Sequence, residues 1–69
     1  MVIVRLKLDK ILEDKKISRY MLSKNTGIRY HIIDNYYKNK VTRYDSFVLA
    51  KICESLNINA SDLFETIYK

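Results

Sequence analysis

Residues 18–40 constrain the fold of this chain more than any other feature. They have the pattern of two short helices joined by a turn at Gly27, the only glycine in the sequence. Glycine takes a positive φ without steric cost, as a tight turn after a helix requires. Leu22 is an apolar anchor for the first helix, and Ile28 and Ile33 are anchors for the second. The spacing predicts two helices set at a fixed angle.

Apolar periodicity extends this interpretation to the whole chain. It predicts helices at about residues 7–15, 19–26, 30–38, 46–56 and 60–66. The β-branched run at 2–6 leaves room for a short N-terminal strand. With no proline and a single glycine, tight β-hairpins and glycine-rich phosphate loops are disfavoured. The apolar content of 48% suffices for one small core, so we expect residues 1–69 to form a single all-α domain.

Positive charge is concentrated on the same segment. The chain has a net charge of +5, but residues 15–43 alone carry a formal +7, with Asp34 as their only acid. A solvated surface helix normally mixes its signs, so this imbalance indicates a surface that binds a polyanion. The cations are Lys15, Lys16, Arg19, Lys24, Arg29, Lys38, Lys40 and Arg43.

Other classes of function find little support. There is no carboxylate pair, phosphate loop or activated nucleophile, so we do not expect an enzyme. His31 is the only histidine and lacks metal-ligand partners, and the single Cys53 falls on an apolar helical stripe. No metal, cofactor or small-molecule ligand is expected. No apolar run approaches the ~20 residues of a membrane span, so we expect a cytoplasmic protein.

The ordered set of motifs resembles the Xre/Cro-type (lambda-repressor-like) family of phage and bacterial transcriptional regulators. The resemblance covers roughly residues 6–65. It rests on SRYMLSKNTGI, IIDNYYKNK and LAKICESLNI followed by DLF. It implies a compact five-helix DNA-binding domain with a helix-turn-helix motif at about 18–40. The recognition helix, at about 30–38, would enter the major groove of an operator.

The resemblance also implies roles for individual residues. Those expected to contact DNA bases are Arg29, Tyr30, His31, Asp34 and Asn35. Those expected to contact DNA phosphates are Arg19, Lys38, Lys40 and Arg43. Three departures from the family pattern stand out: Met21 replaces an acid, Arg29 replaces a Ser or Thr cap, and Asn39 replaces a glycine. We expect Asn39 to be tolerated, because asparagine also adopts the left-handed conformation.

Homodimerisation on a double-stranded DNA operator is a further implication, with the two recognition helices one DNA turn (~34 Å) apart. The candidate interface is residues 2–6 together with the C-terminal apolar side chains Leu63, Phe64, Ile67 and Tyr68. Alternatively, these two segments pair with each other and close the core. The function expected is a sequence-specific regulator, of repressor type. The alternative is a protein-interaction module such as an antitoxin or anti-repressor partner.

Overall fold

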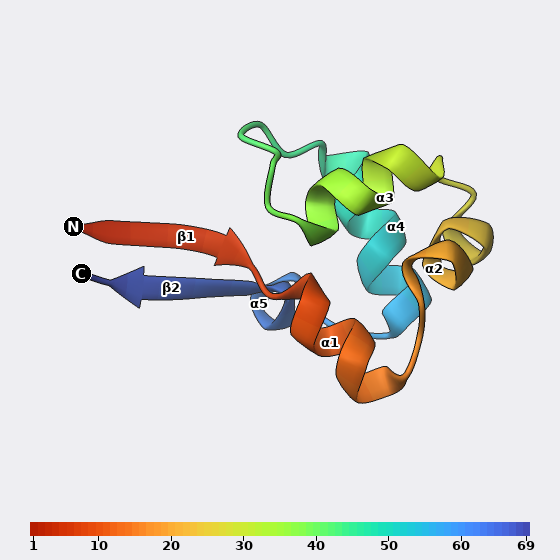
Figure 1. Ribbon diagram of the computed structural model, residues 1–69, viewed down its shortest axis with the longest axis horizontal. Coiled ribbons are helices and arrows are strands. Elements are labelled where there is room, and N and C mark those ends of the chain that lie inside the picture. The colour runs from red at the N-terminus through yellow and green to blue at the C-terminus, as the bar shows by residue number, and fades with distance from the viewer.

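The computed structural model describes residues 1–69 and contains five helices and two strands. In chain order these are β1 (Val2–Leu6), α1 (Leu8–Lys15), α2 (Arg19–Thr26), α3 (Tyr30–Tyr37), α4 (Ser46–Leu56), α5 (Ala60–Leu63) and β2 (Phe64–Tyr68). The helices form one body, and the two strands project from it as a ribbon (Figure 1). The five-helix fold and the N-terminal strand expected from the sequence are confirmed. None of the helices has the length and apolarity needed to cross a membrane.

A single core holds the helices together. Leu22 of α2 and Ile33 of α3 are fully buried in it, as the sequence predicts for the two anchors. Burying such a side chain contributes about 1.5–3 kcal/mol, so the angle between α2 and α3 is fixed by packing as well as by the turn. The core residues are Leu6, Leu8, Leu12, Leu22, Ile33, Tyr36, Ile52, Leu56 and Leu63.

The turn between α2 and α3 has the predicted glycine geometry and a local hydrogen-bond network. Gly27 has a φ of 75°. The Ser23 hydroxyl donates to the Ile28 carbonyl at 2.5 Å. The buried Thr26 hydroxyl donates to the Leu22 carbonyl at 2.7 Å and accepts from the Ile28 N–H at 3.2 Å. The polar groups of the turn therefore have partners inside the chain, and the direction of entry into α3 is fixed.

Substitution of Gly27 should cost stability through the backbone alone. A Cβ added there would meet no atom within 4 Å, so no clash is involved. We expect Gly27→Val to lower the free energy of unfolding by about 1–3 kcal/mol, because the positive φ is strained for a β-branched residue. Gly27→Asn should lose much less. Urea unfolding of both variants measures the difference, and equal midpoints for the two would contradict a conformational role.

The helices differ in how their first turns are capped. The Ser18 hydroxyl accepts from the Met21 N–H at 3.0 Å and so caps α2. At the start of α5, the Asp62 carboxylate accepts from the Asn59 N–H at 3.1 Å. Arg29 precedes α3 without a side-chain cap, as expected for a residue that replaces Ser or Thr. The Arg29 side chain is exposed and makes no ion pair within the chain.

The prediction of a fifth helix at about 60–66 is wrong at its C-terminal end. α5 ends at Leu63, and residues 64–68 form β2, which pairs antiparallel with β1. The aromatic and β-branched side chains of this segment suit a strand that has a partner. Similarly, α3 ends at Tyr37, and Lys38 is its C-cap rather than its last residue.

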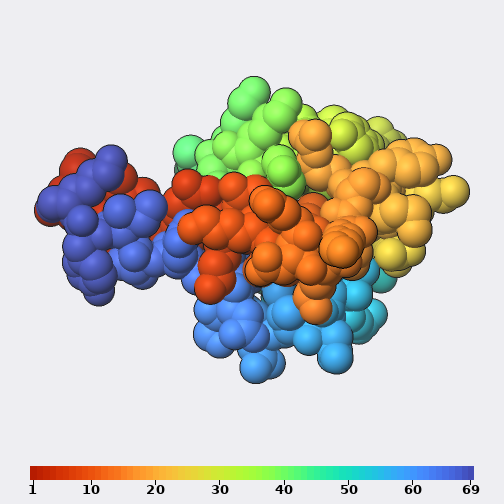
Figure 2. Space-filling view, turned by 60° about the horizontal axis from the view of Figure 1, so that its bottom comes forward, coloured from red at the N-terminus to blue at the C-terminus, as the bar shows by residue number.

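Pairing between the two ends of the chain leaves much of the ribbon uncovered. Val4 lies opposite Thr66, and Val2 lies opposite Tyr68. Because alternate residues of a strand share one face, these four side chains lie on the same face of the ribbon. Val4 is 58% exposed and Tyr68 is 81% exposed. Figure 2 shows the ends of both strands extending beyond the helical body. The ribbon therefore carries an apolar surface that the core does not use.

Asn39 connects the end of α3 to the base of this ribbon. It has a φ of 58°, in the left-handed region that the sequence predicts for this position. Its amide oxygen accepts from the Leu6 N–H at 2.8 Å, and its amide nitrogen donates to the Leu6 carbonyl at 3.0 Å. Asn39 is therefore more than a tolerated substitute for glycine, because its side chain joins α3 to β1.

Candidate nucleic-acid interface

One face of α3 is exposed and polar. Ile33 and Tyr36 are buried on the opposite face of this helix. The exposed side chains follow helical spacing on the outer face, so they project together from a helix whose other side is fixed in the core. The exposed residues are Arg29 at the helix start, followed by Tyr30, His31 and Asn35. None of these four side chains forms a hydrogen bond or ion pair inside the chain.

Asp34 lies on the border of this face and binds two cations. Its Oδ1 lies 2.5 Å from Nη1 of Arg19, the first residue of α2. Its Oδ2 lies 3.1 Å from Nζ of Lys38, one helical turn further along. The Arg19 guanidinium also lies over the Tyr37 ring, 4.5 Å from the ring centroid. The structure thus brings together three predicted DNA-contacting residues, one of them an acid, and connects α2 with α3.

The two cations stabilise the ionised form of Asp34. A hydrogen bond from the Lys38 ammonium holds the pKa of the Asp34 carboxyl below its usual value, with Arg19 adding to the effect against partial burial. At neutral pH the carboxylate is ionised, and its two oxygens share one negative charge. In the protein without DNA, they accept from side chains of the same chain.

Two further predicted phosphate contacts, Lys40 and Arg43, are exposed on the loop that follows α3. Tyr44 anchors this loop: its ring lies edge-on to Tyr36, with centroids 6.0 Å apart, and to Phe64, with centroids 5.3 Å apart. Such aromatic pairs favour edge-to-face geometry. The two cations are therefore carried by a loop that packs against the core.

Sequence reasoning missed the contacts of three residues that shape this surface. Tyr37 supports the Arg19 guanidinium, Tyr44 anchors the basic loop, and Asn39 fixes the end of α3. Adjacent residues of a helix point to different sides, so only one of Tyr36 and Tyr37 can enter the core. Tyr36 does so, and its hydroxyl accepts from the Asp45 N–H at 3.0 Å. The sequence carried no signal for the contacts of Tyr44 and Asn39.

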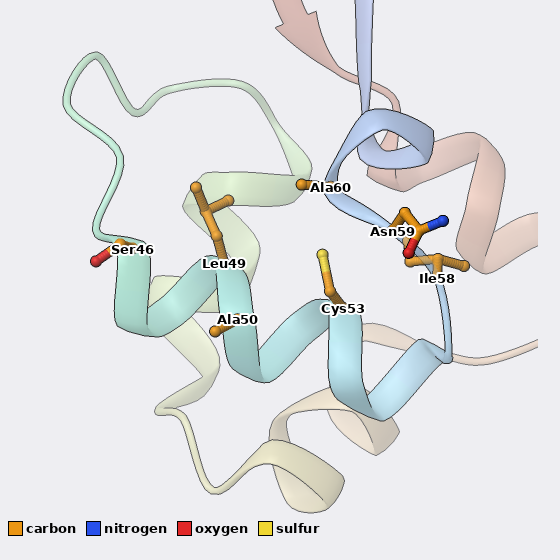
Figure 3. Close-up of a pocket in the computed structure, with 7 residues that line it drawn as sticks. All are labelled: Ser46, Leu49, Ala50, Cys53, Ile58, Asn59 and Ala60. Carbon is orange, nitrogen blue, oxygen red and sulfur yellow. The ribbon is translucent and has the colours of Figure 1, made fainter.

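A concave surface lies on α4 and on the turn that leads to α5 (Figure 3). Its volume is about 410 Å³, and no cation lines it, so it offers nothing to a phosphate. The Cys53 side chain points into it, and burial raises the pKa of the Cys53 thiol, as does the charge of Asp62. The thiol is therefore protonated at neutral pH and weakly nucleophilic. No three His, Cys, Asp or Glu side chains lie where they could hold a metal ion. The lining residues are Ser46, Leu49, Ala50, Cys53, Ile58, Asn59 and Ala60.

Comparisons with known proteins find a matching family and similar solved structures. The profile of the Cro/C1-type HTH DNA-binding domain matches residues 7–69. A candidate DNA-binding protein from Bacteroides fragilis is similar in structure, with a TM-score of 0.78 and 21% identity over 91% of this chain and 100% of that chain. The transcriptional regulator VanUg is similar with a TM-score of 0.75 and 26% identity, over 99% of this chain and 89% of that chain. No curated protein gives a significant match.

Proposed function

Because this chain belongs to the family of Cro/C1-type helix-turn-helix DNA-binding domains, we propose that it is a sequence-specific transcriptional regulator of repressor type. In this proposal residues 1–69 act as one helix-turn-helix domain, and α3 enters the major groove of an operator. The transcriptional regulator VanUg, which has a similar fold, supports a regulatory role.

The observation that carries the proposal is the free outer face of α3. Its exposed side chains have no partners inside the chain, although they are held on a helix that is anchored in the core. Arginine pairs well with guanine, and asparagine with adenine, in the major groove. We assign base contacts to Arg29 and Asn35 first, with Tyr30 and His31 beside them.

Phosphate contacts surround this face in the proposal. Arg19 lies at the N-terminus of α2, where backbone N–H groups also favour an anion. Lys38 follows α3, and Lys40 and Arg43 follow on the loop. Phosphate contacts fix the position of a protein on the duplex without recognising sequence. These four cations would therefore set the affinity and its dependence on salt.

We also propose that the protein binds its operator as a homodimer through the ribbon of β1 and β2. An isolated two-stranded ribbon is marginal in water, and this one exposes apolar side chains on one face. A second copy of the same surface would cover those side chains. Two domains would then bind two half-sites, which is how compact helix-turn-helix proteins gain affinity.

Selection from random duplex DNA tests the proposed function directly. We expect it to enrich a short sequence in two symmetric copies, with centres about one DNA turn apart. Titration of the purified protein on the selected duplex then gives the affinity and the number of chains bound. Failure to enrich any sequence, together with failure to bind duplex DNA at low salt, would contradict the proposal.

Arg29→Ala and Asn35→Ala should change which bases are preferred. Loss of a bidentate base contact typically costs about 1–3 kcal/mol and relaxes specificity at one position. Repeating the selection with each variant measures this effect. Lys40→Ala is the matched control, because loss of a phosphate contact weakens binding to all sequences alike and reduces the salt slope by about one. Unaltered base preference in both helix variants would show that the groove assignment is wrong.

A further inference from the structure

We infer that Asp34 is an intramolecular competitor of DNA phosphate. In the absence of DNA it occupies Arg19 and Lys38, and it thereby lowers the affinity of the protein for duplex DNA of any sequence. The inference rests on the proposed function, because it concerns the same surface and the same ligand. It replaces the expectation that Asp34 contacts a base.

The geometry gives Asp34 the coordination that a phosphate would have. Two separate oxygens of one anion each bind one cation, at 2.5 Å from Arg19 and 3.1 Å from Lys38. These cations come from two elements, the start of α2 and the end of α3. A DNA phosphate that approached this junction would compete for the same two groups.

The distribution of charge points to the same role. Asp34 is the only acid among residues 15–43, and the structure places it between two of the eight cations in that segment. The remaining cations of the segment form no ion pair within the chain. Asp34 therefore neutralises cations at the surface that would meet DNA, whereas the other acids of the chain lie outside the segment.

The three side chains are exposed enough for the exchange to occur. The exposed fraction is 20% for Asp34, 34% for Arg19 and 47% for Lys38. Ion pairs that solvent reaches are weak, so a phosphate can displace the carboxylate. Because the Tyr37 ring supports Arg19 independently of Asp34, the guanidinium stays at the start of α2 after the exchange.

Binding to DNA therefore begins with the loss of two internal pairs, whatever the base sequence. Removing the carboxylate should strengthen binding to operator and to random duplex by the same factor and leave their ratio unchanged. In the wild-type complex the displaced carboxylate keeps a cation beside the duplex, so about one ion fewer is released and the slope of log affinity against log salt is shallower by about one. If Asp34 contacted a base, removing its carboxylate would instead alter the ratio of the affinities for operator and random duplex.

The test compares D34N with E65Q, which removes one negative charge elsewhere. Glu65 lies on β2 and also pairs with two cations, at 3.2 Å from Arg5 and 3.6 Å from Lys10. We expect D34N to bind a random duplex of fixed length about tenfold more tightly at low salt, with a salt slope steeper by about one. E65Q should remain within about twofold of the wild-type protein, because the cations it frees belong to β1 and α1 and are not among the proposed phosphate contacts. If D34N folds poorly, D34A gives the same measurement on a residue of high helix propensity.

Three results would overturn the inference. One is an equal gain for D34N and E65Q, which would reflect net charge alone. Another is weaker binding of D34N to every duplex, which would make Asp34 a positioning residue for Arg19. The third is a changed base preference in repeated selection, which would make Asp34 a base contact. If the proposed function itself is wrong, the wild-type protein will bind no duplex at any salt concentration. That outcome differs from the three results above.

Discussion

The double variant Val4→Lys/Thr66→Glu should sediment as a monomer and bind a two-half-site operator at least about 10²-fold more weakly than the wild-type protein. Linking two binding events typically raises affinity 10²–10⁴-fold over either one alone, and a monomer loses this gain. The wild-type protein should sediment as a dimer. Sedimentation, followed by titration on duplexes with one and with two half-sites, measures both effects. Binding to a single half-site should remain unchanged.

The design of this variant leaves the ribbon itself intact. Val4 and Thr66 lie directly opposite each other, so the new lysine and glutamate form a cross-strand pair that favours the strand pairing. The net charge of the chain does not change. The substitutions disturb only the outer apolar face, where Val4 is exposed.

A matched variant on the other face identifies the interface. Ile3 and Ile67 are also opposite each other, and they point away from the face that carries Val4. Ile3→Lys/Ile67→Glu should stay dimeric if the exposed face is the interface. A dimeric Val4→Lys/Thr66→Glu variant would show that this face is not used. A wild-type monomer that binds singly to the operator would reject dimerisation altogether.

Helix positions could be predicted because their signals are local. Apolar spacing and the cap at Ser18 lie within a few residues of the features that they determine, and the predicted ranges 19–26 and 46–56 agree with α2 and α4. The turn at Gly27 could also be predicted from a local signal, because glycine takes the positive φ that the turn requires. Tertiary contacts then stabilise elements that the local sequence already favours.

The ribbon could not be predicted in full because each strand depends on a distant partner. Residues 64–68 continue the apolar pattern of a helix, and only pairing with residues 2–6 makes them a strand. β propensity reflects packing against neighbours more than an intrinsic backbone preference. A pattern within one segment therefore indicated apolar content correctly and secondary structure incorrectly.

The contacts of the candidate site also fall into two kinds, those with a local signal in the sequence and those that depend on the tertiary structure. The spacing of Asp34 and Lys38, four residues apart on one helix, is a local signal for their ion pair. The pair between Asp34 and Arg19 joins two helices and depends on the angle between them. The resemblance to a family could suggest which residues face DNA. It carried no information on which of these residues bind each other in the protein without DNA.

Asn39→Gly should lower the free energy of unfolding by about 1–3 kcal/mol, although glycine is the residue that the family pattern favours here. The substitution keeps the left-handed backbone, so the loss comes from the side chain alone. It leaves the N–H of buried Leu6 without its partner, whereas the Leu6 carbonyl still accepts from Arg5 Nε at 3.2 Å. Each unsatisfied buried polar group costs about 1–3 kcal/mol. A domain of this length has a total stability of only about 3–10 kcal/mol, so the effect should be large.

Asn57→Gly is the control, because Asn57 has a φ of 56° at the end of α4 but no side-chain bond to another element. Urea unfolding should show a large loss for Asn39→Gly and almost none for Asn57→Gly. Equal losses would show that the bridge to Leu6 contributes nothing. Because the bridge ties α3 to the base of the ribbon, a folded Asn39→Gly protein should also lose more affinity for two half-sites than for one. The spacing of two α3 helices in a ribbon-mediated dimer depends on that connection.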